Sequence, residues 1–350
     1  MLASTLSRYK LKAHLTHLRG VYVLLALLFC SPFISCEETD SPGDYDIHKV
    51  LLPDNIFSED SEYLAVIGDI QEYTGSPWLT KYLIHSLDWI RNQNRYFGKI
   101  KCVLQDGDLT WSNAKNQWDL ADISFRHLCD STLLIPCTGN HDYTWSEGSM
   151  IKDRNSTLLN NLTSVSLLDS SIERYYETGK RENIIVPVNI SGKTYWIISL
   201  EFGPRKSVVE WAAQIVSENR DKKFILMTHE WLSAGGIRIS EGSYAEIQFS
   251  TLSYSTPEEV WRMLVYPNDN ILCVLCGHNG FCKYYFSENI AGRQVCQILF
   301  NLQYQENGGD SIIQLWEFPK GENVIKISVY NTLKRSFHTD KSTEIQINLN

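Results

Sequence analysis

The chain has 350 residues and carries 41 acidic against 32 basic residues, which gives a formal net charge of −9 at pH 7. Its first 35 residues include four basic and no acidic residues, so the charge of the remainder falls from −9 to −13. This excess argues against bulk nucleic acid as a partner, because no basic face would offset the repulsion of the phosphates.

The amino-terminal segment has the pattern of an export signal. A basic start is followed by a short apolar core over residues 21–30, which is shorter than the ~20 residues that a membrane-spanning helix needs. Phe33-Ile34-Ser35-Cys36 resembles a bacterial lipobox, although Leu is the usual first residue. We expect residues 1–36 to be a signal peptide and Cys36 to be lipid-anchored at a bacterial membrane, on the periplasmic or cell-surface side. A plain signal peptide cut near Ser35 is the alternative.

Residues 37–60 begin with an acidic stretch rich in helix breakers, which predicts a tether without a core. From residue 61 onward about 290 residues remain, enough for one large domain over residues 61–350. No linker or repeat divides this part of the chain.

Apolar runs alternate with helical patterns in the first two thirds of the domain. Runs rich in Ile, Val and Leu predict strands that are covered on both faces; they occupy residues 63–67, 100–104, 133–135, 224–227 and 271–275. Helices are expected between them, including one that Pro257 opens behind a capping box formed by Thr256 and Glu259.

The remaining stretches complete the expected fold. Residues 143–189 are polar and irregular, and are expected to form an excursion over a functional site. After Gly277 the pattern becomes that of strands, and we expect this half to form the second sheet of the molecule. The predicted fold is an α/β fold, a two-sheet mixed β-sandwich flanked by helices.

Metal-ligand side chains follow five of the predicted strands. The strings are Gly68-Asp69-Ile70-Gln71, Gly107-Asp108, Gly139-Asn140-His141-Asp142, Thr228-His229 and Gly277-His278. Side chains at such strand ends meet along one edge of a sheet, and carboxylate, amide and imidazole groups together hold transition metals. Any one string alone is also typical of a turn or a structural histidine. Their order and common placement indicate a metal centre.

The individual residues suggest roles in hydrolysis. Asp108 could bridge two ions about 3.5–4 Å apart, and water between them would lose a proton and become the nucleophile. His141 lies in a loop beside a ligand, which suits a general acid for the leaving oxygen. Asp142 is expected to orient His141.

These strings resemble the pattern of the calcineurin-like metallophosphoesterase family: Asp-x-His, Gly-Asp, Gly-Asn-His-Asp/Glu, a strand-end His and Gly-His-x-His. The resemblance runs from about Tyr63 to the carboxyl terminus and implies a four-layer α/β/β/α fold. It also implies two ions of iron, manganese or zinc, which would hydrolyse a small phosphomonoester or phosphodiester outside the cytoplasm through metal-activated hydroxide. The implied ligands are Asp108 as the bridge, Asn140, His229 and His278 in one site, and Asp69 with Gln71 in the other.

Two departures from the family pattern concern the Asp69 site. Gln71 replaces one family histidine and Gly280 replaces another. The amide oxygen of Gln71 would favour a harder ion, whereas Gly280 supplies no ligand. The chain looks most like a secreted or lipid-anchored branch with Asp-x-Gln, in which Gln305, Asn279 or Asp310 would supply the missing contact. The alternative is a non-catalytic ligand-binding lipoprotein with a degraded first metal site.

Four aromatic residues fall in loops near the predicted site: Trp111, Tyr143, Trp145 and Trp231. They could stack on a sugar or a base, or they could pack beneath the long loops. Arg205 is a further candidate for a contact with a substrate phosphate.

Overall fold

The computed structural model describes residues 53–340 and 343–349. The expected signal peptide, Cys36 and the first part of the tether lie outside these residues. The tether is shorter than residues 37–60, because Asp54 is buried and accepts hydrogen bonds from the indole of Trp89 and the hydroxyl of Tyr330, both at 2.7 Å. Within the described ranges, no helix is long and apolar enough to cross a bilayer.

The first sheet has seven strands in the order β15-β14-β13-β1-β2-β3, with β16 also paired to β14. Strands β1, β2 and β3 are parallel, and β13 runs antiparallel to β1. The bounds are β1 Ser61–Ile67, β2 Ile100–Gln105, β3 Leu133–Pro136, β13 Ile312–Pro319, β14 Val324–Asn331, β15 Ser336–Phe337 and β16 Ile345–Asn348.

The second sheet also has seven strands, in the order β11-β12-β10-β9-β8-β7-β6. Strands β8, β9, β10 and β12 are parallel, and antiparallel strands lie at both edges. The bounds are β6 Arg174–Tyr175, β7 Ile184–Ile190, β8 Lys193–Leu200, β9 Lys223–Thr228, β10 Ile271–Cys276, β11 Cys282–Glu288 and β12 Gln294–Phe300. A separate hairpin joins β4 Trp145–Ser146 to β5 Met150–Ile151.

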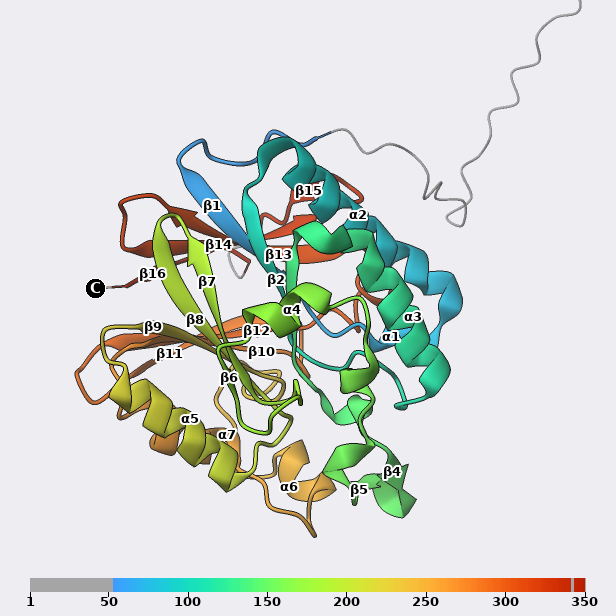
Figure 1. The fold of residues 1–350 in the computed structure, drawn as a ribbon, viewed down its shortest axis with the longest axis vertical. Helices are drawn as coiled ribbons and strands as arrows, with labels where there is room; N and C mark the ends of the chain where they lie inside the picture. Colours follow the sequence, from blue (N-terminus) through green and yellow to red (C-terminus); the bar gives the residue numbers. More distant parts are fainter. Residues whose placement is uncertain (1–52, 341–342, 350) are drawn as a thin grey trace, which may run out of the picture. The chain divides into compact units, whose positions relative to one another are not determined.

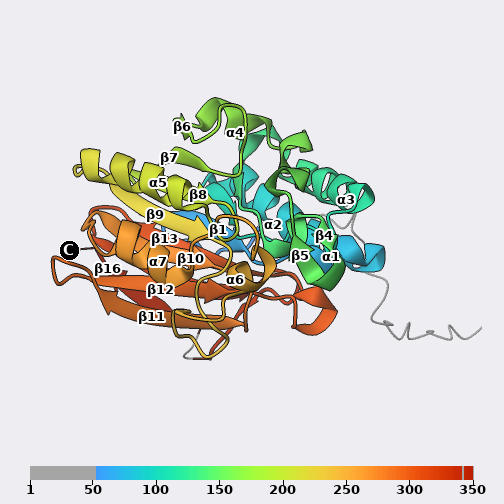
Figure 2. The same ribbon diagram turned by 90° about the horizontal axis from the view of Figure 1, so that it is seen from below.

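Helices cover the outer faces of the two sheets (Figures 1 and 2). Helices α2 and α3 lie over the first sheet, and α5 and α7 lie over the second. The helices are α1 Gln71–Gly75, α2 Thr80–Phe97, α3 Lys115–Phe125, α4 Ser166–Ser171, α5 Lys206–Glu218, α6 Tyr244–Gln248 and α7 Pro257–Val260, which continues as a π-helical turn over Trp261–Val265. The predicted capping box is present at α7, where the Thr256 and Glu259 side chains each accept a hydrogen bond from the other's backbone N–H.

The main core lies between the sheets. One apolar cluster contains inner-face side chains of both sheets, such as Val66 of β1 and Ile225 of β9. A second cluster joins the outer face of the second sheet to α5 and α7 through residues such as Leu226, Val209 and Val260. The molecule is therefore a four-layer α/β/β/α sandwich, and the predicted fold class is confirmed.

Two details of the expected topology were wrong. The strands after Gly277 do not form a sheet of their own: β11 and β12 extend the second sheet, whereas β13, β14 and β16 extend the first. Alternation along a strand shows that it has two different faces, but not which neighbour it pairs with. The irregular excursion also ends earlier than residue 189, because β7 begins at Ile184.

The carboxyl ends of β1, β2, β3, β9 and β10 meet at one edge of the sandwich. The turn after β2 contacts the end of β1, where the Asp106 amide donates to the Ile67 carbonyl at 3.4 Å. In the second sheet, the Gly277 amide after β10 donates to the His229 carbonyl after β9 at 3.0 Å. The five predicted ligand strings are thereby brought to the same place.

Candidate metal centre

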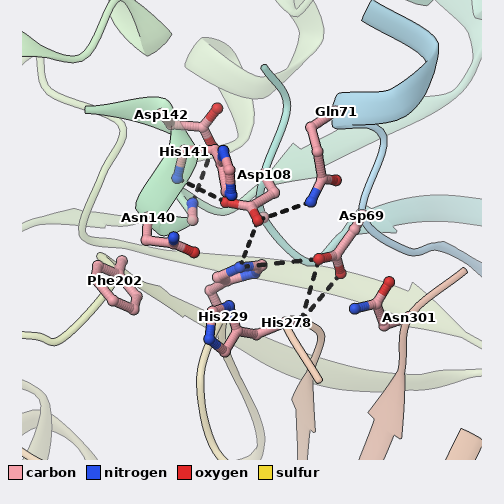
Figure 3. Close-up of polar contacts among 12 residues, drawn as sticks. Asp69, Gln71, Asp108, Asn140, His141, Asp142, Phe202, His229, His278 and Asn301 are labelled. Atoms are coloured by element: carbon pink, nitrogen blue, oxygen red, sulfur yellow. Dashed lines mark hydrogen bonds and ion pairs between the residues drawn. The ribbon is translucent and has the colours of Figure 1, made fainter. Parts of the chain in front are cut away.

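Three of the predicted ligands form a compact, buried cluster. One ligand atom from each of Asp108, His229 and His278 lies within 4.8 Å of the others, and all three residues are buried. Nε2 of His229 is 3.1 Å from Oδ2 of Asp108 and 4.0 Å from Oδ2 of Asp69. Figure 3 shows Asp69 and Gln71 on one side of Asp108 and Asn140 on the other.

Glycine precedes Asp108, Asn140 and His278 because a side chain there would occupy the space of another candidate ligand. A Cβ at Gly107 would lie 2.3 Å from Nδ1 of His229, and one at Gly139 would lie 2.1 Å from Oδ1 of Asp108. A Cβ at Gly277 would lie 2.2 Å from Oδ1 of Asp69. The Gly-Asp, Gly-Asn and Gly-His strings thus have a steric cause, since the five loops approach closely at the site.

Backbone contacts hold the ligands in position. Asp108 and His278 both adopt left-handed backbone angles, with φ of 53° and 69°, which cost energy in a residue with a Cβ. The amide of His278 donates to both oxygens of Asp69, at 3.1 and 3.3 Å. Nδ1 of His229 lies 2.9 Å from the carbonyl of Asp106, so this nitrogen carries the proton and Nε2 faces the cluster.

Unpartnered polar atoms show that these residues fit a metal ion. Within the described ranges, Oδ1 of Asn140, Nε2 of His278 and Oε1 of Gln71 are buried and have no hydrogen-bond partner. A buried acceptor without a partner costs roughly 1–3 kcal/mol. Each of these atoms is a ligand type for divalent ions, and they surround the same carboxylates.

The buried acidic groups of the site also favour a cation. Burial raises the pKa of Asp69 to about 7, although His229 opposes the rise. Burial and the neighbouring Asp69 raise the pKa of Asp106 well above its usual range. Burial opposes ionisation of Asp108 as well, but His229 holds the pKa of its carboxyl below the usual range. Burial would lower the pKa of His229, yet Asp108 and Asp69 raise it to about 10. Three buried carboxyl groups thus lie around one imidazole, and a divalent ion would favour the ionised form of all three.

The Asp69 side of the site contains two residues that the sequence did not reveal. Gln303 donates through Nε2 to Oδ2 of Asp69 at 3.4 Å and to the His278 carbonyl at 3.3 Å. Gln71 donates to Oδ2 of Asp108 at 3.0 Å and also to Oε1 of Gln303. Asn301 lies beside Asp69 (Figure 3) and is fully buried. The signal that could have found Asn301 and Gln303 is their position just after β12, the same rule that located the other ligands.

The residues expected to supply the missing contact lie elsewhere or are otherwise bound. Asp310 binds Asn331 and Lys334, and Gln305 is not among the residues that line the site cavity. Asn279 does line the cavity, but its amide donates to the Leu232 carbonyl at 3.1 Å.

Asp142 does not orient His141, contrary to expectation. Its carboxylate is buried and accepts hydrogen bonds from the amides of Leu109, Thr110 and Gly139 at 2.9–3.0 Å, so it fixes the two ligand loops to each other. Nδ1 of His141 instead lies 2.6 Å from the carbonyl of Trp111. A carbonyl only accepts hydrogen bonds, so Nδ1 is the donor and Nε2 remains for a substrate.

The aromatic candidates divide into two pairs. Trp231 and Tyr143 are buried and belong to the core. Trp111 and Trp145 are exposed and line a cavity of about 320 Å³ that also contains Asp108, Asn140, His141 and His278. Arg205 does not line this cavity, and its guanidinium binds Glu201 and Glu177, both at 2.8 Å.

Comparison with known proteins places this site in a family. The family model for calcineurin-like phosphoesterases matches residues 63–280, a range that contains the predicted ligands from Asp69 to His278. The chain therefore belongs to the calcineurin-like phosphoesterase family, which implies divalent metal ions at the cluster described above. The resemblance inferred from the sequence is confirmed.

Individual relatives are distant. The uncharacterized protein YvnB of Bacillus subtilis (strain 168) is 23% identical over 294 residues, which cover 81% of this chain and 21% of that protein. Among solved structures, purple acid phosphatase PPD1 from yellow lupin matches with 11% identity and a TM-score of 0.47, over 83% of this chain and 54% of the other. The 5'-nucleotidase precursor from Thermus thermophilus matches with 12% identity and a TM-score of 0.43, over 82% and 55%. This chain thus spans about a fifth of YvnB and about half of the two enzymes.

Proposed function

We propose that this protein hydrolyses phosphate esters with the help of bound divalent metal ions. The observation that carries the proposal is the convergence of Asp108, Asn140, His229 and His278, whose ligand atoms are buried and face one another. Membership in the calcineurin-like phosphoesterase family supports the same reaction.

Two ions fit the donor atoms. Asp108, Asn140, His229 and His278 would hold one, and a set of mixed nitrogen and oxygen donors suits iron, manganese or zinc. Asp69 and Gln71, with Asp108 shared between the sites, would hold the other. When bound, such ions lower the pKa of water at the site towards neutrality and offset charge on the phosphoryl oxygens.

His141 is the residue best placed to assist the leaving group. Its backbone amide donates to Oδ1 of Asp108 at 2.9 Å, which fixes the residue next to the cluster. The Trp111 carbonyl accepts from Nδ1, so a protonated ring directs its Nε2–H into the cavity. From there it can give a proton to the departing oxygen.

The first test counts bound metal and measures turnover in the same preparations. Asp108→Asn should abolish turnover and lower the number of bound ions, while circular dichroism stays unchanged. His141→Asn should keep the ions and lower kcat by roughly 10²–10⁴-fold. Near-normal turnover in Asp108→Asn would contradict the mechanism. A wild-type chain that binds no ion even after soaking with Mn²⁺ or Fe²⁺ would favour a non-catalytic ligand-binding protein instead.

We further propose that the reaction takes place outside the cytoplasm, with Cys36 attached to lipid. The support is the basic and apolar pattern of residues 1–36. In a bacterial host, labelled palmitate should be incorporated into the full chain but not into Cys36→Ser. Incorporation into both, or into neither, would refute the anchor.

A further inference from the structure

The site cavity is bordered by aromatic side chains. At about 320 Å³ it has the size of a small-molecule pocket rather than a surface for a polymer. Four aromatic residues of its lining are exposed: Trp111 (45%), Trp145 (37%), Tyr244 (47%) and Tyr304 (71%). Exposed aromatic rings next to buried ligands would favour contact with a flat apolar group.

The elements that carry the ligands also hold these rings in place. The imidazole of His141 packs between Trp111 and Trp145, with ring centroids 5.1 and 4.6 Å apart. The indole of Trp145 donates to the Asn140 carbonyl at 2.9 Å. Tyr244 packs edge-on against His278 at 4.5 Å. Trp111, Trp145 and Tyr244 are therefore positioned before a substrate arrives, which lowers the entropy lost on binding.

Apart from bound ions, the described lining of the cavity offers no permanently positive side chain to a substrate. Within residues 53–340 and 343–349, no lysine or arginine lines the cavity, whereas Glu72 lies in it together with Asp108. Arg205, the cation expected from the sequence, is bound to Glu201 and Glu177. At pH 7 a phosphomonoester carries a charge of roughly −1.5 to −2, whereas a diester carries a single negative charge. Glu72 would repel the former more strongly.

We propose that the centre acts on small phosphodiesters in which the substituent that stays on phosphorus is aromatic and is bound by Trp145 and Tyr304, and that it disfavours phosphomonoesters. The inference rests on the phosphoesterase function proposed above. The oxygen of water would bond to phosphorus as one P–O ester bond breaks, and His141 would give its proton to the departing oxygen. The proton that the water loses would restore His141. The products are a phosphomonoester and an alcohol or phenol.

Three substrates with the same leaving group test the proposal on the metal-loaded chain: bis(4-nitrophenyl) phosphate, methyl 4-nitrophenyl phosphate and 4-nitrophenyl phosphate. Each releases 4-nitrophenolate, so differences in kcat/KM reflect the rest of the molecule. We expect both diesters to exceed the monoester. Faster hydrolysis of the monoester would overturn this inference and leave the phosphoesterase function standing. No hydrolysis of any of the three would count against the phosphoesterase function itself.

Variants separate recognition from intrinsic reactivity. Tyr304→Ala should raise KM for the bis-aryl ester by about tenfold, the loss expected for one stacking contact, with little effect on the methyl ester. Trp145→Ala should change the ratio of aryl to methyl ester in the same direction, but it should also slow both esters, because Trp145 packs against His141. Tyr304→Phe keeps the ring and should behave like the wild type. Tyr96→Ala, an exposed tyrosine on α2, serves as the control. An unchanged ratio of aryl to methyl ester in both alanine variants would refute the aromatic contact.

Glu72→Gln tests the charge argument separately. Removal of this negative charge should raise kcat/KM for the monoester by roughly two- to fivefold relative to the diesters, as expected for one charge at a partly exposed site. Equal effects on the monoester and the diesters would show that Glu72 does not discriminate between them.

Discussion

At the scale of single residues, the site depends on the lack of a side chain at Gly277 as much as on the ligands. A methyl group there would lie 2.2 Å from Oδ1 of Asp69 and 2.9 Å from Oδ1 of Asp106. We expect Gly277→Ala to displace Asp69, to release the ion on that side and to leave the fold intact. Elemental analysis and circular dichroism check this. Gly235→Ala is the matched control, because its nearest neighbour, Oγ of Ser233, is 3.7 Å from the added Cβ. Equal metal content in both variants would contradict the steric argument.

At the Asp69 site, Gln71 and Gly280 stand where the family has histidine ligands. Gln303 is the residue best placed to supply a contact in their place. Its amide reaches Asp69 and the His278 carbonyl, and rotation of that amide would present its oxygen to an ion. Gln303→Leu should weaken Mn²⁺ binding at one of two sites, and Gln303→His should shift that site towards zinc. Titration calorimetry with each ion measures both effects. Gln305→Leu should behave like the wild type, and a matching loss in that variant would refute a specific role for Gln303.

The sequence predicted the ligands better than it predicted their surroundings. Asp108, Asn140, His229 and His278 lie in the short turns that follow β2, β3, β9 and β10, so their convergence follows from the topology of the sheets. Gln303 also follows a strand, but the sequence suggested Gln305, two positions later. The spacing of residues in a coil does not show which side-chain amide points into the site. Asp142 was assigned to His141 because they are adjacent in sequence, whereas its carboxylate binds the Leu109 and Thr110 amides of another loop.

At the scale of elements, the strands were predictable but their partners were not. Strands β11, β12, β13 and β14 are all rich in apolar residues, yet β11 and β12 enter the second sheet and β13 and β14 the first. Strand β7 was missed because Pro187 and Asn189 interrupt an apolar run, although its pairing with β8 tolerates both. Pairing between segments far apart in the sequence determined where these strands lie, and the local sequence pattern does not show that pairing.

One arginine with a side chain only 10% exposed fastens the loop between β3 and β6. Arg154 donates to the carbonyls of Phe202 and Gly203 at 3.1 and 2.6 Å and to that of Ser253 at 2.6 Å, and its guanidinium lies 3.8 Å from the ring of Phe249. Arg154→Met should lower the free energy of unfolding by roughly 2–4 kcal/mol, because these carbonyls lose their partner. Urea unfolding measures the loss, and faster proteolysis between residues 144 and 165 would localise it.

Arg220→Met provides the comparison for Arg154. Arg220 pairs with Asp269 at 3.2 Å, but both side chains are at least half exposed. An exposed pair of this kind contributes at most about 1 kcal/mol. Equal destabilisation by the two substitutions would show that Arg154 does not fasten the loop.

At the scale of the whole molecule, α2 connects the start of the domain to its last strands. His85 of α2 is buried, and its Nδ1 lies 3.1 Å from Oγ1 of Thr332, which follows β14. Burial lowers the pKa of His85 to about 4, from an ordinary value of 6.5. The folded chain thus holds this ring neutral at a pH where the unfolded chain protonates it.

We therefore expect the domain to lose stability in acid, and we attribute part of this loss to His85. Its contribution is complete above pH 6.5 and disappears as the pH falls from 6.5 towards 4, because the unfolded state binds the extra proton. At about 1.4 kcal/mol per pH unit, the total approaches about 3 kcal/mol. In His85→Gln, the free energy of unfolding should fall less steeply between pH 6.5 and 4 than in the wild type. The difference in free energy of unfolding between the two proteins should therefore shrink or reverse as the pH drops. Because other groups titrate identically in both proteins, that difference isolates His85. Parallel curves would mean that α2 opens to solvent before the domain unfolds, so that the ring is protonated without loss of the fold.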